Sequence, residues 1–325
     1  MSGNVVCLGE CWIERLFGEP DPSGNPLANW QDFPSGAPAN VATALVKLGT
    51  RASFVGCLGQ DLPGQRLIHE LRQAGVQCDA FQRHATAPTR IVLVMRDGQG
   101  KRQFVGFHLP DPAGFADAHL STKDLSEAVF AQASYLVMGT VGLAYAETGA
   151  AIQQALTWAQ QYGLTTAVDV NWRPAFWPEP EAAAQRILPL LAQVDLLKLS
   201  LEEAQWLFQT EHPATILQRL PQLKAVVITA GAQGCRYAAG SIQGALPAFE
   251  VDSEDTTGAG DAFLAGLIHQ LTKQGLESLQ DAAALQQIIR YASAVGALTT
   301  LRLGAIAAQP RANEVEAFLY LHPLP

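Results

Sequence analysis

The stretch Asp255-Thr256-Thr257-Gly258-Ala259-Gly260-Asp261 is the sequence feature that most constrains how this chain can fold. Apolar residues follow it at helical spacing, at Phe263, Leu267 and Leu271, so it predicts a glycine-rich turn that opens into a helix. The first N–H groups of a helix lack partners within the helix and lie at the positive end of its dipole. The stretch therefore predicts an anion site at a helix start.

Asp261 is the unusual member of this stretch, because a carboxylate repels a bound anion. In a chemical interpretation, the carboxylate takes a proton from an attacking hydroxyl group. In a structural interpretation, Asp261 is an acidic residue in the first turn of a helix, where Asp is favoured. The physical chemistry of the residues alone leaves both interpretations open.

Composition bounds the class of protein. With 48% hydrophobic and 16% charged residues over 325 positions, the chain has the make-up of a globular protein with a large core. A net charge of −9 without runs of Lys or Arg argues against nucleic acid or an anionic membrane as the main partner. No apolar run reaches the roughly 18 residues of a membrane span. The N-terminus lacks the pattern of a secretory signal, so we expect a cytoplasmic location.

The five cysteines are an odd, scattered set, and most of them lie in apolar stretches. Cys7 and Cys11 are four residues apart, but no second Cys/His pair at metal spacing accompanies them. We therefore expect buried, reduced thiols and no zinc site.

Apolar runs alternate with helical patterns along most of the chain, which is typical of a parallel sheet whose strands are buried on both faces. The strands are expected at residues 5–9, 53–59, 135–139, 165–169, 196–200 and 225–229. Two β-rich runs, 89–94 and 101–107, flank Asp97-Gly98-Gln99-Gly100 and predict the one clear hairpin. Residues 18–34 are rich in Gly, Pro, Asn and Asp and predict irregular structure.

Polar motifs follow several of these strands, where open α/β sheets place ligands. Each motif also has a structural interpretation. Taken alone, the segment from Gly36 to Asn40 is a turn followed by a helix cap. The structural alternatives for single charged residues are an ion pair of Arg173 with Asp169, an exposed helix-start carboxylate at Glu203, a solvated strand charge at Arg90, and a surface ion pair of Glu14 with Arg15 or a nearby residue of the small sheet.

Together these motifs resemble the ribokinase-like sugar kinases, the PfkB family. All seven positions of Asp255–Asp261 match the family signature, and the likeness extends from Gly9 to about Phe318. The segment Ser35–Ala42 is similar to the N-terminal motif of fructokinases, and Asp169–Arg173 followed by Trp177 also favours that branch. The Walker phosphate loop is absent, so phosphate binding must depend on the late helix start.

Two departures from the family pattern concern the sugar side. Ser35 stands where the family usually has a second glycine. Glu14 stands where fructokinases typically have Asp, so its carboxylate reaches one methylene further.

The resemblance implies a single ribokinase-like α/β domain over residues 1–325, with a mostly parallel central sheet and helices on both faces. A small β-rich lid would be formed by segments about 11–34 and 86–110, and a homodimer through this lid is expected. The implied reaction is ATP-dependent phosphorylation of a sugar primary hydroxyl, with D-fructose first among the substrates and Mg²⁺ as cofactor. The rivals are a kinase for ribose, a nucleoside or another keto-sugar, and a non-catalytic fructokinase-like interaction protein.

The resemblance also implies roles for individual residues. Asp261 would be the catalytic base, and the amides of Gly258, Ala259 and Gly260 would form the anion hole. The implied sugar contacts are Glu14, Gly36, Asn40, Arg90, Arg173 and Asp261. The implied nucleotide contacts are Ser200, Thr229, Gly231, Gly234, Gly258 and Gly260. Glu203 would help position the Mg²⁺ shell indirectly, and the backbone near Asp255 and Thr257 would bind a monovalent cation such as K⁺.

Overall fold

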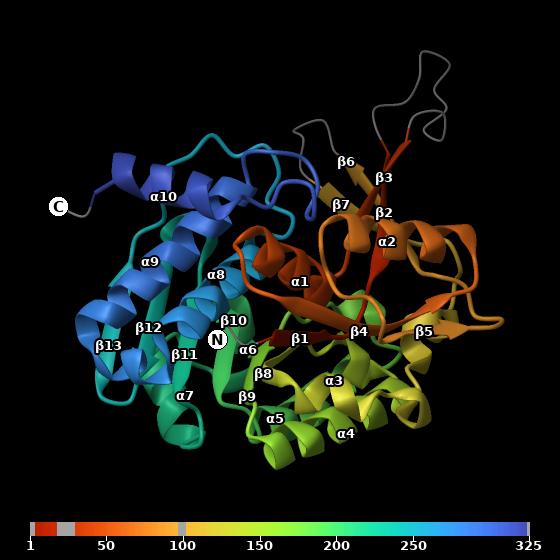
Figure 1. The fold of residues 1–325 in the computed structure, drawn as a ribbon, viewed down its shortest axis with the longest axis horizontal. Coiled ribbons are helices and arrows are strands. Elements are labelled where there is room, and N and C mark those ends of the chain that lie inside the picture. Colours follow the sequence, from red (N-terminus) through yellow and green to blue (C-terminus); the bar gives the residue numbers. More distant parts are fainter. Residues whose placement is uncertain (1–3, 18–29, 97–101, 324–325) are drawn as a thin grey trace.

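The computed structural model describes residues 4–17, 30–96 and 102–323, and within them most strands pair in one large sheet (Figure 1). Its nine described strands run in the order β13 (Ile242–Leu246), β12 (Cys235–Ala239), β11 (Ala225–Thr229), β10 (Leu196–Ser200), β9 (Thr165–Asp169), β8 (Ala133–Met138), β1 (Asn4–Leu8), β4 (Ala52–Gly59) and β5 (Phe81–His84). The pairs from β11 to β5 are parallel, and β12 and β13 are antiparallel. The predicted mostly parallel sheet is confirmed.

The strands of the large sheet are apolar on both faces because each face packs against helices. Along β1, Val6 and Leu8 belong to one core, whereas Val5 and Cys7 belong to a second core on the opposite face. Burying one such aliphatic side chain stabilises the fold by about 1.5–3 kcal/mol. Continuous apolar runs in the sequence therefore correspond to strands with no solvent face.

Helices cover both faces of the large sheet (Figure 1). The helices on one face are α1 (Ala37–Lys47), α2 (Leu62–Gln73), α8 (Ala259–Gln274) and α9 (Ala282–Thr299). Those on the other face are α3 (Glu127–Ala131), α4 (Ala146–Tyr162), α5 (Ala183–Leu191), α6 (Leu201–Phe208) and α7 (Pro213–Arg219). The last helix, α10 (Ala312–Leu321), packs on α9. Short 3₁₀ turns fill several of the connections.

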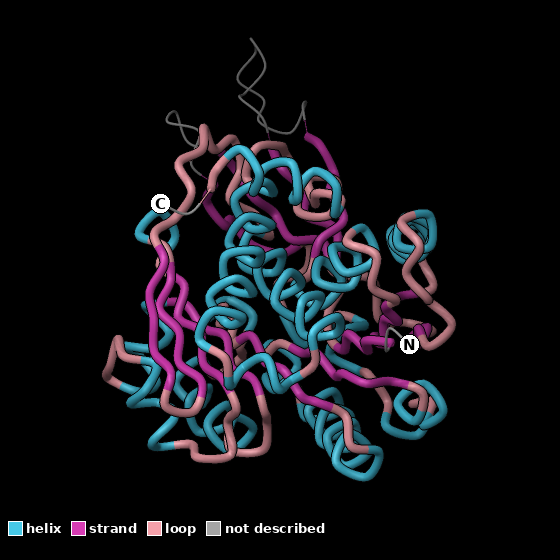
Figure 2. The backbone as a smooth tube through the Cα atoms, turned by 60° about the vertical axis from the view of Figure 1, so that its left-hand side comes forward, coloured by secondary structure: helices cyan, strands magenta, loops and turns pink. Residues whose placement is uncertain are grey.

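A separate small sheet lies beside the large one (Figure 2). Its described strands follow the order β3 (Trp30–Ser35), β2 (Trp12–Phe17), β6 (Ile91–Arg96) and β7 (Arg102–Phe107). The antiparallel pair of β6 with β7 confirms the predicted hairpin, and its turn at 97–100 lies outside the described residues. The prediction of irregular structure over 18–34 is wrong for residues 30–34. These residues belong to β3, which pairs with β2 despite its polar composition.

The expectation of a single clear hairpin is also wrong. Strands β12 and β13 form a second one at the edge of the large sheet, with Gly240 at a φ of 53° between them. A two-residue turn with positive φ matches the twist of paired strands. Only the two residues Gly240-Ser241 indicate this turn in the sequence, and the pattern of apolar residues around them does not.

All five cysteines are buried free thiols, as expected. Within the described residues, no helix combines the length and the apolar character needed to cross a bilayer. The cytoplasmic location stays a prediction.

His269, a buried histidine on α8, lies between this helix, the end of α1 and α9. His269 is 1% exposed, and its Nδ1 is 2.7 Å from the Thr50 hydroxyl. Its ring stacks on Tyr291 at 5.6 Å between centroids. Burial, with a smaller contribution from the charge of Lys273, lowers the pKa of His269 from 6.5 to about 4. The folded protein therefore holds this imidazole in its neutral form.

This histidine is expected to make the folded state less stable in acid. The unfolded chain takes up a proton near pH 6.5 and the folded chain only near pH 4. The free energy of unfolding therefore falls as pH drops through this window, by about 3 kcal/mol in total. Urea unfolding of wild type and His269→Gln from pH 7.5 to 4 measures the difference. Parallel curves for the two proteins over that range would show that His269 does not titrate as proposed.

Candidate active site

The glycine-rich stretch forms the start of α8, as predicted. Gly258 is the residue before the helix and has a φ of 78°, in the left-handed region that favours glycine. A Cβ atom at Gly258 would lie 2.9 Å from the Cβ of Ala305, so a larger residue would displace this neighbour. No side chain caps the helix start. Its N–H groups remain suited to an anion, as the sequence predicts.

Asp261 lies in the first turn of α8 with a buried side chain. The side-chain amide of Asn40 donates a hydrogen bond of 2.8 Å to its Oδ2. Burial raises the pKa of Asp261 to about 6, and the negative charge of Asp169 adds to this shift. The Asn40 hydrogen bond and the positive charges of Lys198 and Arg173 oppose it. The carboxylate thus has a pKa close to neutrality, which suits a general base.

Asp169 and Lys198 form a buried ion pair beside this helix start. The Lys198 Nζ is 2.6 Å from the Asp169 Oδ2, and both side chains are almost fully buried. A Cβ atom at Gly260 would lie 2.9 Å from this ammonium, which places the pair directly against the predicted anion hole. The alternative in which Asp169 pairs with Arg173 is wrong, because Lys198 takes that position. Among the described residues, Asp169 Oδ1 has no hydrogen-bond partner.

Arg173 is exposed just beyond the end of β9, where its Nη1 donates to the Trp172 carbonyl over 3.1 Å. Its positive charge acts to lower the pKa of Asp261. Asn171 precedes it with a φ of 41°, a left-handed conformation that Asn tolerates better than most residues. The strand end therefore turns sharply, and this turn leads directly into Arg173.

Glu203 joins two neighbouring strand ends. Its Oε2 accepts a hydrogen bond of 2.7 Å from the Ser200 N–H, and its Oε1 accepts one of 2.8 Å from the Trp172 N–H. The Ser200 hydroxyl in turn caps α6 by accepting from the Glu203 N–H. Burial, followed by the charge of Asp169, raises the pKa of Glu203. The alternative of an exposed helix-start carboxylate is wrong, because the group is at the helix start but buried.

The turn after β11 lies at the same edge of the sheet. Thr229 ends the strand beside Ser200 of β10, and Gly231 and Gly234 follow with φ values of 54° and 89°. The Ala230 N–H donates to the Gly234 carbonyl, which closes the turn. The contact of these residues with a nucleotide stays a prediction.

The residues predicted to contact a sugar come from several elements, among them β2 and the link from β3 to α1. Gly36 is the single residue between β3 and α1. A Cβ atom there would lie 2.5 Å from the Glu10 carbonyl oxygen. Glu14 lies on β2 and is buried, and its neighbour Arg15 pairs with Asp32 at 2.7 Å. The alternative of a surface ion pair between Glu14 and Arg15 is therefore wrong, and the alternative of a pair with a residue of the lid stays untested.

Glu10, for which the sequence predicts no role, is a buried acid just after β1. Burial raises its pKa to about 7, with contributions from the negative charges of Asp117 and Asp261. Its Oε1 has no hydrogen-bond partner among the described residues. A buried polar atom without a partner is rare, so this carboxyl group points to a ligand or a water molecule.

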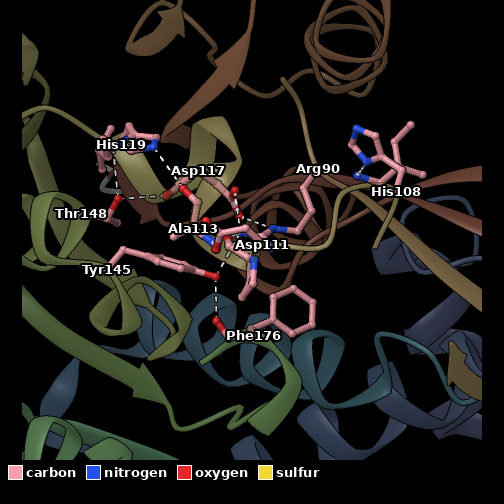
Figure 3. Close-up of polar contacts among 12 residues, drawn as sticks. Arg90, His108, Asp111, Ala113, Asp117, His119, Tyr145, Thr148 and Phe176 are labelled. Atoms are coloured by element: carbon pink, nitrogen blue, oxygen red, sulfur yellow. Dashed lines mark hydrogen bonds and ion pairs between the residues drawn. The ribbon is translucent and has the colours of Figure 1, made fainter. Parts of the chain in front are cut away.

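Arg90 is a buried cation at the base of the small sheet (Figure 3). Its guanidinium forms two hydrogen bonds with Asp117, of 2.8 and 2.9 Å, and further ones with the Pro112 carbonyl and the Tyr145 hydroxyl. The Tyr145 hydroxyl donates onward to the Phe176 carbonyl. The alternative of a solvated strand charge is therefore wrong. Nη1 has no partner among the described residues, and a direct sugar contact stays a prediction.

Asp255 ties the glycine-rich stretch to a second loop. Its Oδ1 accepts from the N–H and the hydroxyl of Thr257, and its Oδ2 accepts from the Gly304 N–H over 2.9 Å. In the described residues, no group of three or more His, Cys, Asp or Glu side chains is arranged to hold a metal ion.

Sequence reasoning missed Lys198, Asp117 and Tyr145. Lys198 carries a usable signal, because a lysine within the apolar run Leu196-Leu197-Lys198-Leu199 has to find a buried partner. Asp117 and Tyr145 carry none, since they lie 27 and 55 residues from Arg90 in otherwise ordinary segments.

The large parallel sheet, the separate small sheet and the glycine-led helix start beside a buried Asp define a ribokinase-like kinase fold. A family model described as "pfkB family carbohydrate kinase" matches residues 2–312. The chain belongs to this family, and is a carbohydrate kinase by class.

Comparisons with individual proteins agree. Fructokinase-1 of Oryza sativa subsp. japonica is 35% identical over 317 residues, which cover 96% of this chain and 96% of that protein. A solved fructokinase from Xylella fastidiosa with bound ATP superposes with a TM-score of 0.89 at 29% identity and covers 99% of each chain. A fructokinase from Vibrio cholerae O395 with fructose, ADP and calcium ion bound superposes with a TM-score of 0.83 at 27% identity. That match covers 98% of this chain and 99% of the other.

The pKa of Asp261 offers a direct test of the site's electrostatics. Asn40→Ala removes the hydrogen bond that favours the charged carboxylate, so the pKa of Asp261 is expected to rise above about 6. Carbon-13 NMR titration of the aspartate carboxyl carbons measures it, with the Asp261 signal assigned by its loss in Asp261→Asn. An unchanged midpoint in Asn40→Ala would contradict this account of the shift.

Proposed function

We propose that this chain transfers the γ-phosphoryl group of ATP to a primary hydroxyl group of a sugar, above all of D-fructose to give fructose 6-phosphate. The observation that carries the proposal is the position of Asp261, a buried carboxylate with a pKa near 6 in the first turn of a helix that opens with glycines. A carboxylate there can accept a proton close to the place where an anion binds. The likeness to fructokinases from plants and bacteria supports fructose as the sugar.

In this proposal, Asp261 takes the proton of the attacking hydroxyl while the amides of Gly258, Ala259 and Gly260 hold the transferring group. Arg173 adds positive charge from the end of β9. Phosphoryl transfer depends mainly on positioning and on electrostatic stabilisation, which this arrangement supplies. The buried Lys198 lies next to Gly260 and offsets part of the negative charge of Asp169 and Asp261.

The nucleotide is assigned to the adjacent strand ends. Ser200, Thr229, Gly231 and Gly234 lie along the edge formed by β10 and β11, on the side where α8 begins. Relatives solved with bound ATP, or with ADP and calcium ion, support ATP and a divalent metal as ligands.

Mg²⁺ fits this edge through water rather than through direct protein ligands. Both oxygens of Glu203 already accept a backbone N–H, while one oxygen of Asp169 keeps no described partner. Mg²⁺ retains several waters and binds mainly to phosphate oxygens, where it neutralises their charge. K⁺ is assigned to the backbone near Asp255 and Thr257.

The sugar is assigned to the space between the small sheet and α1. Glu14, Gly36, Asn40 and Arg90 approach it from different elements, and we infer that the small sheet closes over it as a lid. A homodimer through this sheet belongs to the same proposal. The buried atoms Glu10 Oε1, Asn40 Oδ1 and Arg90 Nη1, which have no described partners, support a polar ligand in this region.

The function is tested by ADP release from purified protein across fructose, ribose, adenosine and other sugars. Fructose is expected to give the highest kcat/KM. A different preferred sugar would identify one of the rival kinases, and no ADP release with any of them would favour a non-catalytic protein. The intact Gly258, Gly260 and Asp261 argue against the last outcome.

Asp261→Asn is expected to lower kcat by about 10²–10⁴-fold, because the amide keeps the shape but cannot accept the proton. ATP binding, measured by calorimetry, should stay close to that of the wild type. Asp252→Asn, at an exposed position before the glycine-rich stretch, is the matched control. Near-normal turnover in a folded Asp261→Asn protein would remove Asp261 from the role of base.

Glu14→Ala is expected to raise the sugar KM well above tenfold and to leave the KM for ATP nearly unchanged. A site built to bind hydroxyl groups loses heavily when a polar partner is missing. Glu14→Gln keeps the length of the side chain without its charge, so it separates the contribution of the charge from that of hydrogen bonding. If the sugar KM of Glu14→Ala equals that of the wild type, Glu14 is not a sugar ligand.

A further inference from the structure

Lys47, the last residue of α1, reaches across to a loop that follows it by more than 250 positions. Its Nζ donates hydrogen bonds to the backbone carbonyls of Ile306 at 2.8 Å, Ala307 at 3.1 Å and Gln309 at 3.1 Å. An ammonium group has three N–H donors, so this one segment uses all of them. The side chain is half-buried, and burial, followed by the charge of Arg311, lowers its pKa.

The loop that Lys47 holds, residues 304–309, is the loop that packs against the start of α8. Ala305 lies so close to Gly258 that a Cβ atom there would be 2.9 Å from the Ala305 Cβ. The Gly304 N–H donates to Asp255, at the beginning of the same glycine-rich stretch. The loop therefore touches both Asp255 and Gly258, and its position affects the backbone between them.

The loop needs a cation because its carbonyl groups converge. Three carbonyl oxygens that point to one place repel each other unless a positive charge or several donors lie between them. The loop's own bonds are few: the Ala308 N–H donates to the Gly304 carbonyl, and the Gln309 side chain donates to the Ala305 carbonyl. Lys47 therefore supplies a charge and three donors that the loop does not provide for itself.

We propose that Lys47 is a positioning residue for phosphoryl transfer, whose ammonium gathers the carbonyls of residues 306, 307 and 309 and so holds Ala305 against Gly258. In this arrangement the ammonium of Lys47 takes the place of a bound cation in the loop next to the anion hole. The inference rests on the proposed role of Gly258, Ala259 and Gly260. Lys47 bonds only to the loop carbonyls among the contacts of its ammonium, so its proposed effect on the reaction is indirect.

The consequence is kinetic. Small displacements of groups that hold a reacting centre reduce rates strongly, so loss of the cation is expected to lower kcat/KM for ATP by about tenfold to a hundredfold. The KM for the sugar should change by less than about twofold, because Lys47 bonds residues 306, 307 and 309, whereas Asp255 holds the Gly304 end of the loop, which lies against Phe33 of β3. A purely structural lysine would instead lower stability and leave both constants unchanged in the folded fraction.

Three substitutions separate charge from hydrogen bonding. Lys47→Arg keeps the charge and the donors, Lys47→Gln keeps donors without charge, and Lys47→Met keeps only the length. We expect kcat/KM for ATP to fall in the order Arg, Gln, Met, with Arg close to the wild type. Lys273→Met, an exposed lysine in the last turn of α8, is the matched control and should behave as the wild type. Thermal unfolding of each variant verifies folding.

Calorimetry of ATP binding to the same variants gives a readout that does not depend on the sugar. ATP affinity should fall in the same order. Wild-type values for Lys47→Gln would show that the charge is not needed. Equal losses toward ATP and sugar would show that Lys47 affects the whole site, and lower stability with wild-type constants would show a purely structural role. Each of these results overturns the inference. A wild-type protein that binds ATP but phosphorylates no sugar would instead refute the proposed function, and the order of ATP affinities would still decide the role of Lys47.

Discussion

The balance of charge around Asp261 is the constraint on which the rest of the site depends. Asp261 and Asp169 are both buried, and their negative charges raise the cost of removing each from water. The Asn40 hydrogen bond, followed by the positive charges of Lys198 and Arg173, compensates for part of this cost. Without that compensation the pKa of Asp261 would be higher, and less of the carboxylate would be charged at neutral pH. With it, the pKa of Asp261 stays near 6, low enough for the carboxylate to form.

The fold brings these charges together because parallel strands place their carboxyl ends at one edge. Asp169 lies on β9 and Lys198 on β10. The helix α8 begins between these two residues and α1. This arrangement could be predicted from the sequence, since apolar runs locate β9, β10 and β11 at their observed bounds. The glycine-rich stretch likewise locates the helix start. Local chemistry determines both features, and neither requires knowledge of distant contacts.

Partners of charged residues could not be predicted in the same way. Asp169 has an arginine four residues away in sequence, yet its partner is Lys198, on the neighbouring strand. Arg90 has the sequence context of an exposed strand end, but Asp117 and Tyr145 enclose it. β3 was missed because its polar residues are stabilised by pairing with β2, a contact that the residues of β3 do not encode. In each case the deciding interaction joins segments that the chain order leaves apart.

The burial of Arg90 also limits how the small sheet can move. The residue directly precedes β6, and its partner Asp117 lies just after the segment that leaves β7. Thr89 is fixed at the same place by two hydrogen bonds to Asp61, of 2.6 and 2.7 Å, from its hydroxyl and its N–H. Both ends of the β6–β7 hairpin are therefore anchored to the large sheet and its helices. Separating the buried pair would leave an uncompensated charge, which costs about 3–5 kcal/mol. If the small sheet closes over a sugar as proposed, the strands beyond Arg90 would bend while their base stays in place.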